Sequence, residues 1–252
     1  MSPAMNPVMT PSITLATAKR ILTQLRHDPR TIVMLLLVPS LLMTLLRFVF
    51  NNEVTFSRMA PALLGVFPFV IMFLIASVTT LRERTTATLE RLMTMPIAKL
   101  DLILGYAIAF GTIAVFQVGI ATGVSLLWLG LDVVGSVWTL LLIAVLDALL
   151  GMALGLLVSA FATSEFQAIQ FMPLFVLPQF LLCGLLQPRD QMGWLLNWLS
   201  DVMPLSYAVE ALTHVTRSAD FTVTLTRDLL VVAACVLVAL GLGAATLRRR
   251  TP

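Results

Sequence analysis

Two histidines, His27 and His214, are the only imidazoles available for acid–base or metal chemistry in this sequence of 252 residues. They fall on opposite predicted faces of a membrane, and neither belongs to an H-E-x-x-H metal motif. The sequence also contains no G-x-S-x-G nucleophile motif and no G-x-x-x-x-G-K-[ST] phosphate loop. It therefore predicts no catalytic, metal-binding or cofactor-binding residue in this chain, and no binding of ATP in the usual P-loop manner.

A dense group of charges lies in the sequence L-R-E-R-T-T-A-T-L-E-R-L-M-T-M-P, from Leu81 to Pro96. Thr80 and Glu83 have capping-box spacing, and Pro96 disfavours helical geometry at the residue before it, which together predict a short charged helix. The candidate docking residues on it are Arg82, Glu83, Arg84, Leu89, Glu90 and Arg91. This helix suits docking to a soluble partner, but an ordinary solvated loop that fixes membrane topology has the same composition.

A second group of candidates consists of polar residues inside long apolar runs, where they are costly and often functional. These are Asp147, Gln117, Gln170 and Gln179. Asp147 is the clearest of them and could face a dimer interface or a substrate route. Alternatively, it bonds to hydroxyl groups or water inside the protein.

The composition predicts that lipid is the solvent of the elements that carry these residues. Hydrophobic residues make up 59% of the chain and charged residues only 12%, whereas a soluble domain has about 25% charged residues. The net charge is +3, but the basic residues are scattered between apolar runs instead of forming a basic face with interleaved aromatics, which argues against nucleic-acid binding.

The apolar runs are near the roughly 20 residues that cross a bilayer as a helix. They predict an all-α, polytopic membrane protein that forms a single domain over residues 1–252. The expected elements are an amphipathic helix over Ser12–His27 and six spans over Thr31–Phe50, Pro61–Leu81, Gly105–Leu129, Val137–Phe161, Ile169–Leu186 and Leu229–Leu247. Pro29 predicts a corner between the amphipathic helix and the first span.

Prolines and glycines inside the spans indicate how the helices pack. Pro39, Pro68, Pro173 and Pro178 are tolerable there because neighbouring helices can satisfy the carbonyls that proline leaves free. Gly151 and Gly155 have G-x-x-x-G spacing, which permits close contact between helices, either within this chain or in a dimer.

The basic residues predict the orientation of the spans. One side collects Lys19, Arg20, Arg26, Arg30, Arg82, Arg84, Arg91, Lys99, Arg248, Arg249 and Arg250, and the other collects Arg58, Arg189, Arg217 and Arg227. The larger group predicts that both termini and the Arg82–Lys99 segment lie in the cytoplasm. Trp194 and Trp198, one helical turn apart between the fifth and sixth spans, have the spacing of interfacial aromatics, and Ser206 could cap a helix that follows Pro204.

Two motifs give the chain a resemblance to a known family. Arg82-Glu83-Arg84, Thr88-Leu89-Glu90-Arg91-Leu92 and Pro96 resemble the cytoplasmic motif of ABC-2 type permeases, which include daunorubicin-type drug exporter permeases. A second similarity runs from Pro173 to Leu212 and includes Cys183-Gly184-Leu185 and Pro204-Leu205-Ser206-Tyr207-Ala208-Val209-Glu210. Ala87 departs from the first motif, where glycine is common.

The resemblance implies a function that composition alone does not. The charged segment would be a coupling helix in a groove of a separate P-loop ABC ATPase, which holds ATP and Mg²⁺, and the segment before Leu212 would include short re-entrant helices on the outer side. The chain would pair with a second copy or with a homologous permease in a bacterial plasma membrane. Its substrate would be a hydrophobic or amphipathic compound, either a drug or a lipid.

Two other classes of function remain as alternatives. An ATP-independent secondary transporter or channel is expected to use intramembrane charges and often an internal repeat. A membrane-embedded enzyme requires His, Asp, Glu or Ser side chains clustered at one depth. Asp147 is a single charge and no repeat is visible, so both alternatives have less support than the exporter.

Overall fold

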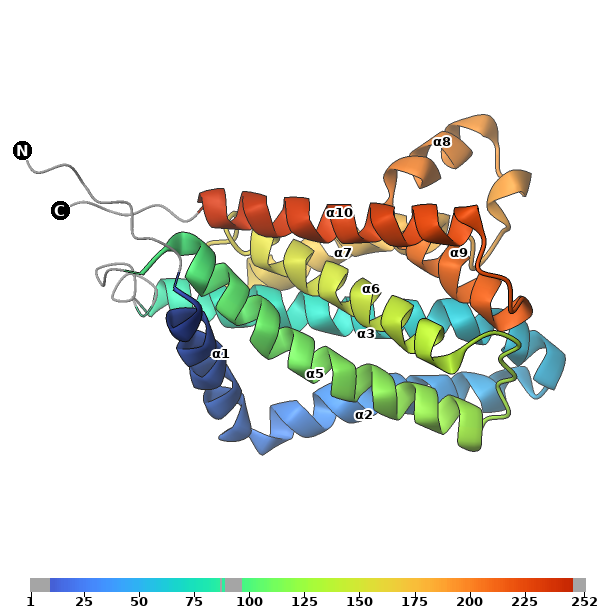
Figure 1. Cartoon of the computed structure of the whole chain (residues 1–252), viewed down its shortest axis with the longest axis horizontal. Helices are drawn as coiled ribbons and strands as arrows, with labels where there is room; N and C mark the ends of the chain where they lie inside the picture. The colour runs from blue at the N-terminus through green and yellow to red at the C-terminus, as the bar shows by residue number, and fades with distance from the viewer. Residues whose placement is uncertain (1–9, 87, 89–96, 247–252) are drawn as a thin grey trace, which may run out of the picture.

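A computed structural model describes residues 10–86, 88 and 97–246, and Figure 1 shows that helices dominate this part of the chain. The elements are α1 (Pro11–Arg26), α2 (Pro29–Phe50), α3 (Glu53–Thr85), α5 (Lys99–Leu127), α6 (Val137–Val158), α7 (Glu165–Leu182), the 3-10 turn η1 (Arg189–Gln191), α8 (Trp194–Val202), α9 (Pro204–Arg217) and α10 (Val223–Thr246). Among the described helices, six are long and apolar enough to cross a membrane, namely α2, α3, α5, α6, α7 and α10. The predicted fold class and the number of spans are therefore confirmed.

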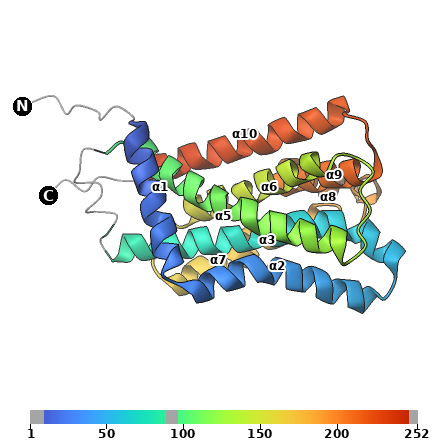
Figure 2. The same ribbon diagram turned by 60° about the horizontal axis from the view of Figure 1, so that its bottom comes forward.

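Helix α1 lies across one end of the bundle, which we call the α1 end (Figures 1 and 2). Its apolar face, including Ala18, Ile21 and Leu25, is buried, as the amphipathic pattern predicts. The predicted corner follows at Asp28, whose carboxylate caps α2 by accepting hydrogen bonds from the amide and hydroxyl of Thr31 at 3.2 and 2.6 Å. These bonds hold the pKa of Asp28 below its usual value.

Helix α3 is longer at both ends than the sequence predicts. It begins at Glu53 because the Asn52 side chain accepts hydrogen bonds from the amides of Val54 and Thr55, so Pro61 lies inside the helix instead of at its start. At the other end it continues to Thr85 without a break at Thr80. The prediction of a separate helix capped by Thr80 and Glu83 is therefore wrong at this point, because both residues belong to the membrane-spanning helix.

The centre of the bundle is the contact between α3 and α6, which is the most extensive one between two helices. A Cβ atom on Gly151 would lie 2.2 Å from the carbonyl oxygen of Phe69, and one on Gly155 would lie 2.3 Å from that of Phe73. Only glycine permits backbones to approach this closely. The G-x-x-x-G spacing therefore serves packing within this chain.

The opposite end of the bundle carries α8 and α9 (Figure 1). Trp194 and Trp198 of α8 are 83% and 60% exposed, which leaves their predicted place at a membrane interface untested. Ser206 does not cap α9, which begins at Pro204. Instead, the hydroxyls of Ser206 and Ser200 donate to the carbonyl of Leu182 at the end of α7, at 3.4 and 2.8 Å, and so satisfy a carbonyl that lacks a partner in its own helix.

Candidate functional site

Three groups of residues are candidates for function, and the first lies where α1, α3 and α5 meet. Glu83, in the last turn of α3, is buried and accepts hydrogen bonds from Nη1 and Nη2 of Arg20 at 3.1 and 3.3 Å. The hydroxyl of Tyr106 on α5 donates to the same carboxylate. The three side chains join three helices at the α1 end.

The charge state of this group follows from its contacts. Burial alone would lower the pKa of Arg20, but its hydrogen bonds to Glu83 and the charge of that residue outweigh burial, so the pKa is raised above its usual value. Arg20 therefore remains cationic at any physiological pH. The interaction is a charge-assisted one between planar groups, which fixes orientation as well as distance.

A second contact holds α1 against α5. Asp101, which is fully buried, accepts hydrogen bonds from the hydroxyl of Thr14 at 2.8 Å and the amide of Thr10 at 3.1 Å. A Cβ atom on Gly105 would lie 2.6 Å from the side chain of Thr17. The amphipathic helix is therefore fixed to the bundle by polar contacts and close packing, as well as by its apolar face.

These contacts change the assignment of the predicted docking residues. Glu83 is not free to meet a soluble partner, because it is already bound by Arg20 and Tyr106. Arg82 is exposed and pairs with Glu165 of α7 at 3.0 Å, whereas Arg84 is half-buried. The remaining candidates, Leu89, Glu90 and Arg91, lie outside the described residues.

The second group consists of the polar residues inside the spans. Asp147 on α6 is fully buried, and neither of its carboxylate oxygens has a hydrogen-bond partner within the described residues. Its oxygen Oδ2 is 2.9 Å from where a Cβ atom of Gly65 on α3 would lie, and Leu212 of α9 lies beside the same glycine. The prediction that Asp147 bonds to hydroxyl groups inside the protein is therefore not met by the described residues.

The glutamines have different surroundings. Gln117 is buried and its Nε2 donates to the carbonyl of Leu35 on α2 at 2.9 Å. Gln179 donates to the carbonyl of Phe175 in its own helix at 3.0 Å and accepts from the amide of Leu205 at 3.4 Å. Gln170 is exposed on α7. None of the three forms a hydrogen bond with Asp147 in the described part of the chain.

The third group forms an open cavity of about 940 Å³ at the α8 and α9 end, which we call the Arg189 cavity. Its walls come from the first turns of α3, the segment between α7 and α8, and helices α8, α9 and α10. The charged residues that line it are Arg58, Arg189, Asp190, Asp201, Glu210, His214, Arg217 and Arg227. No local pattern in the sequence groups these side chains, although the second resemblance motif includes Tyr207 and Glu210.

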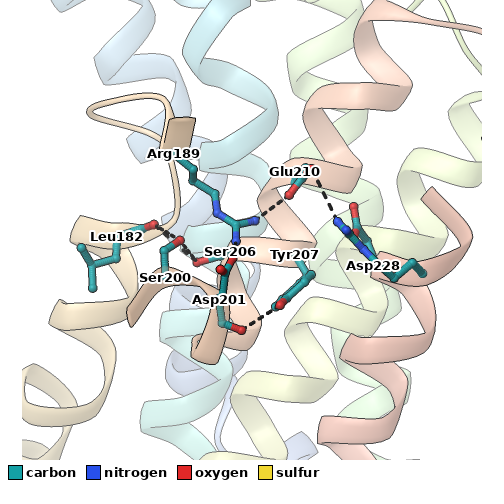
Figure 3. A network of polar contacts seen from close by, with 9 residues as sticks. Leu182, Arg189, Ser200, Asp201, Ser206, Tyr207, Glu210 and Asp228 are labelled. Carbon is teal, nitrogen blue, oxygen red and sulfur yellow. Dashed lines mark hydrogen bonds and ion pairs between the residues drawn. The ribbon is translucent and has the colours of Figure 1, made fainter. Parts of the chain in front are cut away.

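A network of ion pairs includes several of these lining residues (Figure 3). The Arg189 guanidinium binds Glu210 at 2.6 Å and also binds Asp201. Arg227 is 3.7 Å from Glu210 and 2.7 Å from Asp228. Both arginines also lie over the ring of Tyr207, whose hydroxyl donates to the backbone carbonyl of Asp201. The network connects η1 and α8 to α9 and α10.

Across residues 10–86, 88 and 97–246, no three His, Cys, Asp or Glu side chains gather closely enough to hold a metal ion. The three groups are therefore a junction of three helices at Glu83, a buried acid at Asp147, and the open Arg189 cavity with its charged walls.

Comparison with known proteins places this arrangement among transporters. A sequence model of the ABC-2 type transporter family matches residues 12–216. The chain is 26% identical over 145 residues to the probable multidrug ABC transporter permease YbhR of Escherichia coli, which covers 56% of this chain and 39% of that protein. It is 25% identical over 191 residues to the probable multidrug ABC transporter permease YbhS of the same organism, covering 75% of this chain and 51% of that protein.

A eukaryotic relative shows the same similarity. The ABC transporter G family member 20 of Dictyostelium discoideum is 22% identical over 157 residues, which is 62% of this chain and 22% of that protein. The chain therefore spans between about a fifth and a half of the length of these curated relatives.

Proposed function

This chain belongs to the ABC-2 type transporter family, and from that premise we propose that it is the membrane-spanning permease of an ABC exporter. In this proposal, a separate P-loop ATPase binds ATP and Mg²⁺, and the permease pairs with a second copy or with a homologous permease. Its substrate is a hydrophobic or amphipathic compound, a drug or a lipid, which moves out across a bacterial plasma membrane. The permeases of Escherichia coli described above are named as multidrug transporters.

One observation carries the proposal for this chain in particular. The end of α3 is held by Arg20 of α1 and Tyr106 of α5, and the segment that resembles a coupling helix begins at this end. An ATPase can shift the permease only if it makes different contacts with its two states. A rigid junction of three helices at this position would transmit a push on residues 82–96 directly to a membrane-spanning helix.

The orientation follows from the same proposal. The α1 end would face the cytoplasm, together with both termini, because Lys19, Arg20, Arg26, Arg30 and Lys99 lie in or beside α1 and at the start of α5. The excess of lysine and arginine on one side of the spans supports this assignment.

The experiment is reconstitution of the permease with its cognate ATPase in liposomes, with a fluorescent drug and a fluorescent phospholipid as probes. Glu90→Lys should abolish probe export and probe-stimulated ATP hydrolysis, because reversing a charge at a docked interface weakens binding. Asp220→Lys, in the connection between α9 and α10, is the matched control and should leave both activities unchanged. If the permease alone moves the probes at full rate, the exporter assignment fails and the secondary transporter or channel replaces it.

A further inference from the structure

We propose that the Arg189 cavity binds an amphipathic anion, that is, a carboxylate or phosphate monoester that carries an apolar chain. The site is formed by this chain alone, so binding does not require an ATPase or transport. Binding of the anion can therefore be present or absent whether or not the chain is an exporter.

The charges of the cavity favour an anion once the internal pairs are taken into account. Asp201 and Glu210 are both bound by Arg189, and Glu210 is also close to Arg227. Arg227 also binds buried Asp228, which lies outside the lining. Counted over the lining alone, four arginines stand against three carboxylates.

The remaining charges are unequal. Arg58 and Arg217 line the cavity, are exposed, and form no ion pair within the described residues. Among the acids of the lining, Asp190 is likewise exposed and forms no ion pair within the described residues. The unpaired charges of the lining are therefore two guanidinium groups and one carboxylate. A guanidinium always carries its charge and presents paired N–H donors to carboxylate or phosphate oxygens.

The apolar part of the lining selects an amphipathic ligand over a small anion. Val54, Met59, Ala62, Val209 and Leu185 line the same space. A volume of about 940 Å³ lies near the upper end of the range of about 300–1,000 Å³ that is typical of small-molecule sites. The cavity can therefore enclose one alkyl chain in addition to an anionic head.

The experiment measures binding of dansyl-undecanoic acid to the purified chain in nanodiscs of neutral phosphatidylcholine, with empty nanodiscs subtracted. Saturable binding is expected. Dodecyl phosphate should displace the probe, whereas dodecyltrimethylammonium and inorganic phosphate at the same concentration should not.

Paired variants identify the residues responsible. Arg58→Gln with Arg217→Gln should weaken binding about tenfold, which corresponds to about 1.4 kcal/mol. Arg58→Lys with Arg217→Lys should retain most of the affinity because the charges remain. Arg26→Gln with Arg30→Gln removes the same charge from exposed positions at the α1 end and should change nothing.

Cross-linking gives a measurement that does not depend on these variants. A fatty acid that carries a diazirine should attach to peptides containing Met59 or Val209, as mapped by mass spectrometry. Attachment confined to exposed α10 residues such as Leu237 and Val238 would indicate ordinary lipid contact and would overturn the proposal. Unchanged affinity in the paired glutamine variant, or equal displacement by dodecyltrimethylammonium or inorganic phosphate, would overturn it as well.

Two further competitors distinguish the source of the ligand. Lysophosphatidic acid added from water and dioleoylphosphatidic acid placed in the nanodisc both carry a phosphate monoester and apolar chains. Displacement by the bilayer lipid supports a lipid ligand, and displacement by the added amphiphile alone supports a solute. Failure of both to displace the probe would contradict the proposal.

Discussion

The side-chain amide of Gln117 on α5 donates a hydrogen bond of 2.9 Å to the backbone carbonyl of Leu35 on α2. Leu35 lies four residues before Pro39, and proline has no N–H with which to bond that carbonyl. Gln117 therefore supplies from a neighbouring helix the donor that Pro39 lacks. A glutamine inside a membrane span, which would otherwise suggest a substrate contact, is explained here by the backbone of α2.

Replacing Gln117 by Leu should destabilise the protein by about 1 kcal/mol, because the carbonyl of Leu35 then has no partner. Adding Pro39→Ala restores a backbone donor within α2 and should recover most of the loss. Thermal unfolding of the two single variants and the double variant in detergent gives the coupling between the sites. Additive effects of the two substitutions would contradict this relationship.

Replacing Gly151 by Ala should cost about 1–3 kcal/mol, because the added methyl group meets the backbone of Phe69 and must separate α3 from α6. The control is Gly241→Ala on α10, where a Cβ atom meets nothing within 4 Å. That change should be neutral or should stabilise by up to about 1 kcal/mol through helix propensity. Equal melting temperatures for the two variants would show that the close approach is unimportant.

Replacing Glu83 by Ala should destabilise the protein by about 2 kcal/mol, less than the loss of a fully buried ion pair because Arg20 is partly exposed. Glu165→Ala removes the partner of Arg82, whose side chain is 63% exposed, and should cost less than about 0.5 kcal/mol. Thermal unfolding measures both. Limited proteolysis should also cleave near α1 faster in the Glu83 variant, whereas uniform cleavage rates would argue against its role in holding α1.

Replacing Asp147 by Asn should raise the melting temperature while lowering probe export. The buried carboxyl group has no hydrogen-bond partner within the described residues, so the substitution loses no internal contact and removes the cost of holding an ionisable group away from water. When a residue is kept for function at the expense of stability, its replacement raises the melting temperature and lowers the activity. Lower stability with unchanged export would instead assign Asp147 a structural role.

Single cysteines introduced at Asn52, Ser136 and Ser218 should be labelled only from outside cells, and those at Ser164 and Thr94 only from the cytoplasm. The background carries replacements of Cys183 and Cys235. Asn52, Ser136 and Ser218 lie at helix ends at the α9 end of the bundle, and Ser164 lies at the start of α7. Labelling of Thr94 from outside would reverse the proposed orientation and remove the coupling role.

The spans were predictable because each contains enough apolar residues to cross a bilayer whatever its partners are. Gly151 and Gly155 were equally accessible to prediction, since their spacing on one helix face is a local property. The start of α3 was missed because its capping residue, Asn52, precedes a polar stretch before Pro61. Local hydrophobicity assigns such a stretch to a loop.

Contacts between distant residues were not predictable from local patterns. Glu83 suggested an exposed docking charge, but its partners are 63 residues before it and 23 residues after it in the chain. The Arg189 cavity was not predictable for the same reason, because Arg58, Arg189 and Arg217 come from separate segments of the chain. The packing of α3 with α9, and the ion pairs of Arg189 with Asp201 and Glu210, make them walls of one space.

The two parts of α3 are held differently. From Gly65 onwards the helix lies against α6, where Gly65 meets Asp147 and the backbones of Phe69 and Phe73 meet two glycines, and its last turn is bound through Glu83. The part before Gly65 contains Pro61, and proline removes one backbone hydrogen bond and permits a kink.

Arg58 lies before Pro61, at the cavity. A hinge at Pro61 would swing the first turns of α3 while the part from Gly65 onwards, which touches α6, keeps its place. The width of the cavity mouth would then change without repacking of the bundle centre, so that the proposed ligand release at one end and the proposed docking at the other would be separated mechanically along a single helix.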